Sequence, residues 1–158
     1  MPQPLQPLQP LSSDARHVFV YGTLRRGEQR DINRLHPAPV WVGEGSVIGL
    51  LYDLGSYPGL VTAGGAGRVR GEVYVISDVL ERLLDEIEEV WPQQTGEYAK
   101  IELAVLLDET PGATRGEAGG ESHILVQCLA YEIAAARVQG MPTILQGDWV
   151  AYRLVTKS

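Results

Sequence analysis

The chain has 158 residues and a formal net charge of −7, with 44% hydrophobic and 21% charged residues. These values are typical of a single soluble globular domain. The negative charge argues against nucleic-acid binding, which needs clustered Lys and Arg, and it requires any anionic substrate to be held by local donors.

The numbers and positions of cysteine and histidine argue against a disulfide-stabilised protein and against a metal-binding protein. The single cysteine, Cys128, rules out an intrachain disulfide, and its apolar surroundings favour a buried thiol. His17, His36 and His123 lie far apart, so no metal site is expected. No segment approaches the roughly 18 apolar residues of a membrane span. The N-terminus also lacks the pattern of a secretory signal, so a cytoplasmic location is expected.

The first residues differ in composition from the rest of the chain. Proline recurs every third residue from Pro4 to Pro10, which prevents a regular strand or helix there. We expect residues 1–15 to form a disordered tail and residues 16–158 to form the domain. Binding of a partner to the tail is a possible alternative to a dispensable segment.

Most of the domain is predicted to be strand. Short apolar or alternating runs bounded by turn residues indicate strands at 17–21, 40–55, 68–76, 98–107 and 123–133. Glycines interrupt the second of these segments, which favours bulges, strong coiling or close backbone approach. The glycine-rich stretch at 108–122 is predicted to be a long hairpin connection.

One helix is predicted, beginning at Asp78 and ending before Pro92. Asp78 is the expected N-cap, and Glu81 completes a capping-box pattern. The apolar stripe consists of Leu80, Leu83, Leu84, Ile87 and Trp91. Many strands and few helices, without repeated strand-helix-strand units, predict an α+β fold built on a small, strongly curled β-sheet or β-barrel.

Glu88 is the helix carboxylate predicted to lie closest to the core. On a helical wheel with Leu80 placed at 0°, Glu88 lies at about +80° and Asp85 at about +140°. A half-buried carboxylate has its pKa raised toward the range of a general base. The alternative is a solvated acidic face from which Glu88 extends into water.

Two turns are candidates for ligand binding. The first strand ends in Tyr21-Gly22-Thr23-Leu24, where a missing Cβ allows close approach and main-chain N–H groups can hold anionic oxygens. The stretch Tyr57-Pro58-Gly59 is predicted as a type II turn that helps to line a pocket. A plain turn is the alternative at both places. No hydrolase, Walker or dinucleotide-binding motif is present.

Together these segments resemble the gamma-glutamylcyclotransferase-like family. The resemblance extends from Val18 to Tyr152, through VFVYGTLRRGE, GLLYDLGSYPGLV, VRGEVYVI, LLDEIEEV, EYAKIELAV, LAYEI and ILQGDWVAY. It implies a small mixed barrel, a substrate-binding Tyr-Gly-Thr-Leu loop, Glu88 as acid/base and Tyr98 as a wall of the pocket. Lys100 stands where the family often has Arg, a change from a planar fork to a point charge.

The resemblance also implies a reaction that needs no metal or cofactor. Glu88 takes a proton from the α-ammonium group of a gamma-glutamyl amine or peptide. The freed amine then attacks the γ-carbonyl of the same molecule, and 5-oxoproline and a free amine are the products. The alternatives are a barrel that binds a small metabolite without turnover and a scaffold acting through its tail. The amine portion of the substrate and the oligomeric state do not follow from the sequence.

Overall fold

The computed structural model describes residues 16–63, 67–88, 95–108 and 124–156. The strands are β1 (Arg16–Val20), β2 (Val40–Ile48), β3 (Leu50–Asp53), β4 (Pro58–Val61), β5 (Arg68–Ile76), β6 (Tyr98–Leu107) and β7 (Ile124–Ile133). The helices are α1 (Asp78–Ile87) and α2 (Trp149–Thr156), with short 3-10 helices η2 (Ile32–Arg34) and η3 (Ala135–Val138). The predicted tail, and the predicted loop beyond Asp108, lie outside the described residues.

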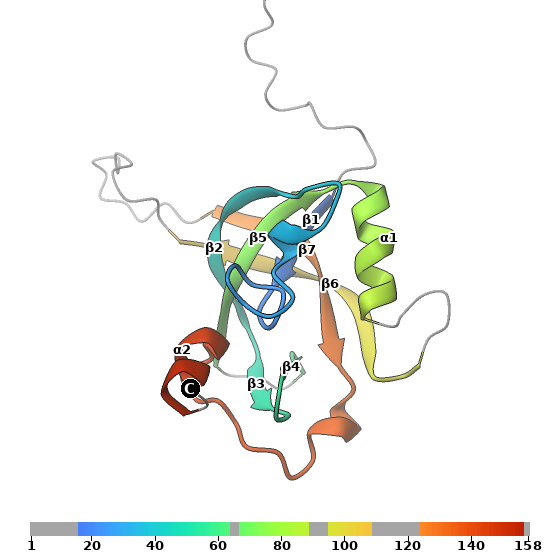
Figure 1. The fold of residues 1–158 in the computed structure, drawn as a ribbon. Coiled ribbons are helices and arrows are strands. Elements are labelled where there is room, and N and C mark those ends of the chain that lie inside the picture. The colour runs from blue at the N-terminus through green and yellow to red at the C-terminus, as the bar shows by residue number, and fades with distance from the viewer. Residues whose placement is uncertain (1–15, 64–66, 89–94, 109–123, 157–158) are drawn as a thin grey trace, which may run out of the picture.

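The strands close into a mixed barrel in the order β1-β5-β2-β6-β7. β1 pairs antiparallel with β5 and parallel with β7, where Val18 lies opposite Leu129 and closes the barrel. β3 and β4 form a separate antiparallel pair. Figure 1 shows this pair at one end of the barrel and α1 along its side. The predicted α+β class and the small curled barrel are therefore confirmed.

Glycines shape the second strand segment as the sequence indicated. The glycine-interrupted β segment predicted at 40–55 divides at Gly49 into β2 and β3. The register of β2 against β5 shifts between Trp41 and Gly43. A Cβ on Gly45 would lie 2.7 Å from the carbonyl oxygen of Leu106, so a side chain there would separate β2 from β6. Gly45 thus permits the close approach of β2 to β6 within the curled sheet.

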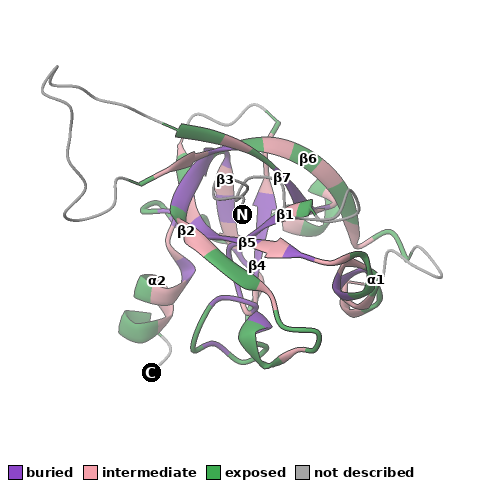
Figure 2. Ribbon diagram, turned by 90° about the horizontal axis from the view of Figure 1, so that it is seen from above, coloured by how far each residue is buried: buried purple, intermediate pink, exposed green. Residues whose placement is uncertain are grey.

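Successive side chains along a strand point to opposite faces of the sheet, and the buried apolar side chains therefore form two clusters. Phe19 points into the barrel with Val69, Val73 and other buried residues. Its neighbours Val18 and Val20 point outward and pack in the cluster that holds α1. Figure 2 shows buried positions at the centre of the barrel, whereas β6 and α2 carry mostly intermediate and exposed positions at the periphery. The outer cluster fixes α1 against β1, β5 and β7.

The helix α1 differs from its prediction at both ends. Ser77 is the N-cap, because its side chain accepts a hydrogen bond from the Leu80 amide, and Asp78 is the first helical residue. The predicted N-cap was therefore wrong by one position. The helix ends at Ile87, with Glu88 as C-cap. Trp91 and Pro92, which were expected to close the helix, lie outside the described residues.

Two further elements correct the sequence-based prediction. Pro58 and Gly59 begin the strand β4 and are not the centre of a turn. The turn lies just before them, where the Leu54 amide donates 2.9 Å to the Tyr57 carbonyl. The helix α2 was not predicted, although a signal was present. Asp148 precedes it and caps its first turn by accepting from the Ala151 amide at 3.2 Å.

Candidate active site

A cavity of about 260 Å³ opens beside the end of β1. Its walls come from β1 with the loop after it, from the turn before β4 and from the C-terminal end of α1. The start of β6 and the last part of β7 complete them. The lining residues are Phe19, Val20, Tyr21, Gly22, Thr23, Leu24, Gln29, Arg30, Ser56, Tyr57, Pro58, Ile87, Glu88, Glu97, Tyr98 and Tyr131. Segments far apart in sequence therefore meet at one place.

The loop after β1 brings Tyr21-Gly22-Thr23-Leu24 to the cavity wall. The amides of Gly22, Thr23 and Leu24 donate no hydrogen bond within the described part of the chain, whereas the carbonyls of all three accept one. The segment therefore lines the cavity with three available main-chain donors. Such a set of donors is suited to an anionic oxygen.

Gly22 is required for a different reason from the one expected. A Cβ at this position would lie 2.7 Å from Cγ and 2.9 Å from Cδ of Pro58. The space beside Gly22 is therefore filled by the Pro58 ring, which has little freedom to move, and not left open for a ligand. The glycine allows the β1 loop and β4 to form one continuous wall.

Tyr21 holds that wall to the barrel. Its hydroxyl donates to the Tyr131 carbonyl at 2.6 Å and accepts from the Leu60 amide at 3.2 Å. Burial and then the negative charge of Glu88 raise the pKa of Tyr21 well above its usual value. Tyr21 therefore stays neutral and joins β1, β4 and β7 beside the cavity.

A buried ionic network positions the same loop from behind. The Arg25 guanidinium donates to Glu72 at 3.1 Å and to Asp148 at 2.9 Å. The other Glu72 oxygen accepts from the Arg26 amide and the Tyr74 hydroxyl, both at 2.9 Å. The basic residues that follow the Tyr-Gly-Thr-Leu segment are thus partly structural, since they tie the loop to β5 and to the start of α2.

Glu88 lies half-buried at the C-terminal end of α1 and lines the cavity. Its amide donates to the Leu84 carbonyl at 2.9 Å, which continues the helical hydrogen bonding to this residue. The charge of Glu88 is among the causes, after burial, that raise the pKa values of Tyr21, Tyr98 and Tyr131. The negative charge of Glu88 therefore acts on all three hydroxyls.

Asp85 corrects the helical-wheel argument, because it is the more buried carboxylate of the two. It is 8% exposed, accepts from the Tyr131 hydroxyl at 2.6 Å and pairs with Lys100 at 2.9 Å. The wheel assumed a single buried stripe, but β6 and β7 also cover this side of the helix. Lys100 also pairs with Glu81 at 2.7 Å and is not among the cavity-lining residues.

The second predicted stretch is divided by the structure. Tyr57 and Pro58 line the cavity, whereas Gly59 does not and lies against Ile133, 2.7 Å from where its Cβ would be. Tyr98 lines the cavity and donates to the Pro58 carbonyl at 3.3 Å. Burial and neighbouring hydroxyls raise the pKa of Tyr98, so this side chain too is a neutral wall residue.

Sequence reasoning missed several lining residues. Glu97 is a second carboxylate of the cavity and accepts a hydrogen bond from the Tyr57 hydroxyl. Gln29 and Arg30 are exposed lining residues, and Tyr131 is a buried one whose carbonyl accepts from the Tyr21 hydroxyl. The family resemblance includes the LAYEI segment that contains Tyr131, but nothing in a single sequence indicates that this segment faces the loop after β1.

The residues described here contain no group of three or more His, Cys, Asp or Glu side chains that could hold a metal ion. Across the same residues, no helix has the length and apolar character needed to cross a membrane.

The barrel is similar to several solved structures. An AIG2-like protein from Mus musculus is 27% identical with a TM-score of 0.62, covering 85% of this chain and 88% of that protein. YkqA from Bacillus subtilis has the same TM-score at 23% identity, covering 90% of this chain but only 42% of that protein. The fold is thus that of AIG2-like proteins.

Sequence comparison defines the family. Residues 18–151 match the family described as gamma-glutamyl cyclotransferase, AIG2-like. A Vibrio cholerae protein provisionally named as a gamma-glutamylcyclotransferase is 44% identical over 73 residues. That match covers 46% of this chain and 62% of the relative, so the chain spans less than two thirds of it. The chain belongs to the gamma-glutamyl cyclotransferase, AIG2-like family.

Proposed function

We propose that this chain releases 5-oxoproline from a gamma-glutamyl amine or peptide, with Glu88 as general acid/base. The observation that supports this most directly is a single cavity lined both by half-buried Glu88 and by the available amides of Gly22, Thr23 and Leu24. Membership of the cyclotransferase family supports the same class of reaction.

The reaction is an internal acyl transfer. The Glu88 carboxylate takes a proton from the substrate α-ammonium group, and the neutral amine attacks the γ-carbonyl carbon. A new C–N bond closes a five-membered ring, and the original amide C–N bond breaks. Glu88 passes protons from the attacking nitrogen to the departing nitrogen, so that the amine leaves protonated. Both reacting groups belong to one molecule, so holding the folded substrate supplies much of the acceleration.

The tetrahedral intermediate carries negative charge on the former carbonyl oxygen. Main-chain amides fixed before the reaction stabilise such an oxygen without reorganisation. We assign this role to the amides of Gly22, Thr23 and Leu24. The Arg25–Glu72–Asp148 network and the Gly22–Pro58 contact hold these donors in place.

Glu88 is assigned the proton transfer in preference to Glu97. The family resemblance implies Glu88 as the acid/base and gives no such role to Glu97, which also lines the cavity and accepts a hydrogen bond from the Tyr57 hydroxyl. The hydroxyl groups of Tyr21 and Tyr98 donate to main-chain carbonyls of the wall, and that of Tyr131 donates to Asp85 behind it. We therefore give these side chains the task of shaping the cavity and excluding water.

The test is an assay of 5-oxoproline release from a panel of gamma-glutamyl amines, amino acids and peptides. Glu88→Gln should lower kcat by roughly 10²- to 10⁴-fold while binding is largely retained. Glu97→Gln should keep most of the turnover, and Glu86→Gln, an exposed position on the same helix, is the matched control.

Three outcomes discriminate between the readings. Loss of turnover in Glu97→Gln but not in Glu88→Gln would exchange the two roles. Equal rates in Glu88→Gln and wild type would overturn the assignment of Glu88. Tight binding of gamma-glutamyl compounds by wild type without any 5-oxoproline would favour the non-catalytic metabolite-binding protein.

A further inference from the structure

A second cavity of about 390 Å³ adjoins the first. It is lined by Gln29, Arg30, Asp31, Arg34, Leu35 and Ile87. Three of these residues, Gln29, Arg30 and Ile87, line both cavities. A ligand held beside Glu88 can therefore extend past Arg30 into the second cavity.

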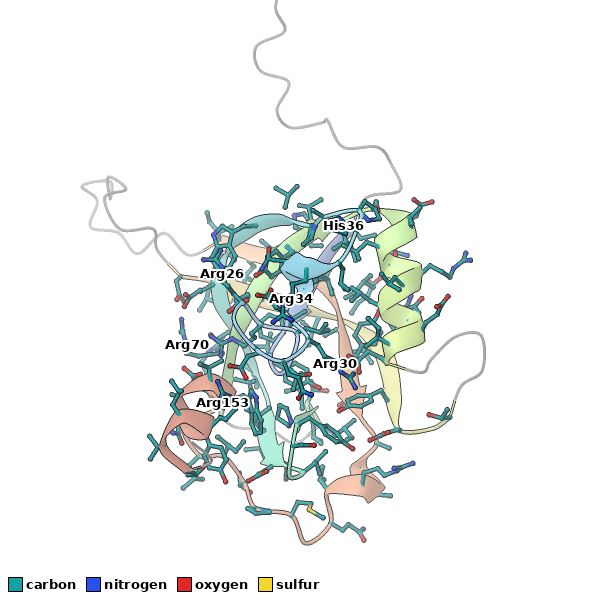
Figure 3. The ribbon with its side chains drawn as sticks, in the orientation of Figure 1. Arg26, Arg30, Arg34, His36, Arg70 and Arg153 are labelled. Atoms are coloured by element: carbon teal, nitrogen blue, oxygen red, sulfur yellow. The ribbon has the colours of Figure 1, made fainter. Side chains whose placement is uncertain are left out.

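Arg30 differs from the other cations of this region, because its side chain makes no hydrogen bond or ion pair within the described residues. Figure 3 labels several of these cations and shows Arg30 and Arg34 on the loop after β1, between α1 and α2 in this view. Arg70 pairs with Glu44 and Asp108, Arg153 pairs with Glu28, and Arg26 lies over the Trp41 ring. The guanidinium groups of these three residues are thus already ion-paired or stacked on an aromatic ring.

Arg34 makes one long hydrogen bond, and its charge also acts on Asp31, the single carboxylate of the second cavity, which is itself fully hydrogen-bonded. The Arg34 guanidinium makes one long contact of 3.4 Å with the Glu28 carbonyl. Asp31 accepts from the Gly27 amide at 2.8 Å and from the amide and side chain of Asn33 at 2.8 and 2.9 Å. Two guanidinium groups against one hydrogen-bonded carboxylate leave the second cavity locally positive.

A positive subsite is unusual in a chain whose net charge is −7. At the first cavity the described acids are Glu88 and Glu97, which would repel a carboxylate on the amine portion of a substrate. An anionic group is therefore directed away from Glu97 and toward Arg30. The planar guanidinium can hold a carboxylate by two parallel hydrogen bonds.

We propose that the second cavity is a subsite for a carboxylate on the amine portion of the substrate, with Arg30 as its main contact and Arg34 beside it. The inference rests on the proposed function and adds a substrate class to it. The preferred substrates are gamma-glutamyl α-amino acids or short peptides, whose carboxylate lies close to the scissile amide. Uncharged alkylamines and diamines lack this group.

The test compares gamma-glutamyl-alanine with gamma-glutamyl-alaninamide, which differ in charge but hardly in size. Wild type should prefer the acid by roughly five- to tenfold in kcat/KM, since an exposed charged hydrogen bond is partly screened by water. Arg30→Gln should bring the two values close together, mainly by raising KM for the acid. Arg30→Lys should keep part of the preference, and added salt should weaken it.

Arg26→Gln is the matched control, because Arg26 lies on the same loop but lines neither cavity. It should leave the preference for the acid unchanged. The proposal is overturned if wild type shows no preference, or if the preference survives in Arg30→Gln. Release of no 5-oxoproline from either compound would overturn the proposed function instead. In that case calorimetry would measure the affinities of wild type and Arg30→Gln for the same two compounds. The subsite is supported if wild type binds the acid more tightly than the amide and Arg30→Gln does not, and it is overturned otherwise.

Discussion

The hydroxyl group of Tyr131 donates a hydrogen bond of 2.6 Å to the carboxylate of Asp85, joining the strand β7 to the helix α1. Asp85 lies one helical turn before Glu88, and Lys100 of β6 completes the contact at 2.9 Å. Burial and the Asp85 carboxylate raise the pKa of Tyr131, so the hydroxyl remains a donor. These contacts determine where the end of α1, and with it Glu88, lies relative to the cavity.

Asp85→Ala should therefore lower both stability and turnover. The buried Tyr131 hydroxyl would lose its acceptor, at a cost of about 1–3 kcal/mol in the free energy of unfolding. A shifted α1 should also reduce kcat for 5-oxoproline release. Urea denaturation and the activity assay measure the two effects. Glu86→Ala, on the exposed face, should change stability by no more than about 0.5 kcal/mol. Equal stability of the two variants would contradict the role of Asp85.

Glu72→Gln tests the network behind the substrate loop. The side chains of Arg25 and Glu72 are only 8% and 6% exposed, so removing the Glu72 charge leaves the buried Arg25 guanidinium with the more exposed Asp148 as its remaining ion-pair partner. We expect a loss of about 3 kcal/mol in the free energy of unfolding. Glu44→Gln is the comparison, because Glu44 and Arg70 are 48% and 35% exposed and such pairs contribute at most about 1 kcal/mol. A loss as small in Glu72→Gln as in Glu44→Gln would count against the network.

Gly22→Ala should damage the cavity wall. The added methyl group would lie 2.7 Å from Cγ of Pro58, so the β1 loop and β4 must move apart. Overpacking of this kind costs about 1–3 kcal/mol, and displaced amides should lower kcat as well. Gly43→Ala is the comparison, because the added methyl group would lie 4.0 Å from its nearest neighbour, a Leu107 methyl group, so stability should change little. The idea fails if Gly22→Ala keeps wild-type kcat and thermal midpoint.

Cys128 should be chemically silent in the native protein. Burial raises the pKa of its thiol to about 12, and the side chain is 2% exposed. Alkylation by iodoacetamide near pH 8 should therefore be very slow until the protein unfolds. Because the pKa of the thiol is higher in the folded protein than in the unfolded chain, its contribution to the stability of the native state is fully present below pH 9. This contribution declines as the pH rises toward 12. Rapid native labelling would show that the thiol is accessible.

The strands were predictable because alternation is a local property. Residues 68–76 and 98–107 form β5 and β6 with the predicted bounds, since each side chain's face follows from its position along the strand. The helix type was also clear from its apolar spacing. The cap was missed by one residue, and α2 and β4 were missed altogether. These elements are short and depend on contacts with distant parts of the chain.

The candidate site was predictable only in part. The strand end at Gly22 and the carboxylate Glu88 could be singled out from local pattern. Sequence spacing could not indicate that Asp85 is the more deeply buried acid, because β6 and β7 cover the helix on a side that a wheel leaves open. Nor could it indicate that Arg30 and Glu97 line the same cavity.

The sequence by itself determined the strand pattern, the helix that carries Glu88 and the glycine needed at the end of β1, because each depends on residues close together in the chain. Only the tertiary structure decided which charges are neutralised inside the protein and which remain at the cavity. Arg25 meets Glu72 and Asp148 across 47 and 123 residues of sequence. Closure of the barrel sets such pairings, and with them the position of Arg30, so no local pattern records them.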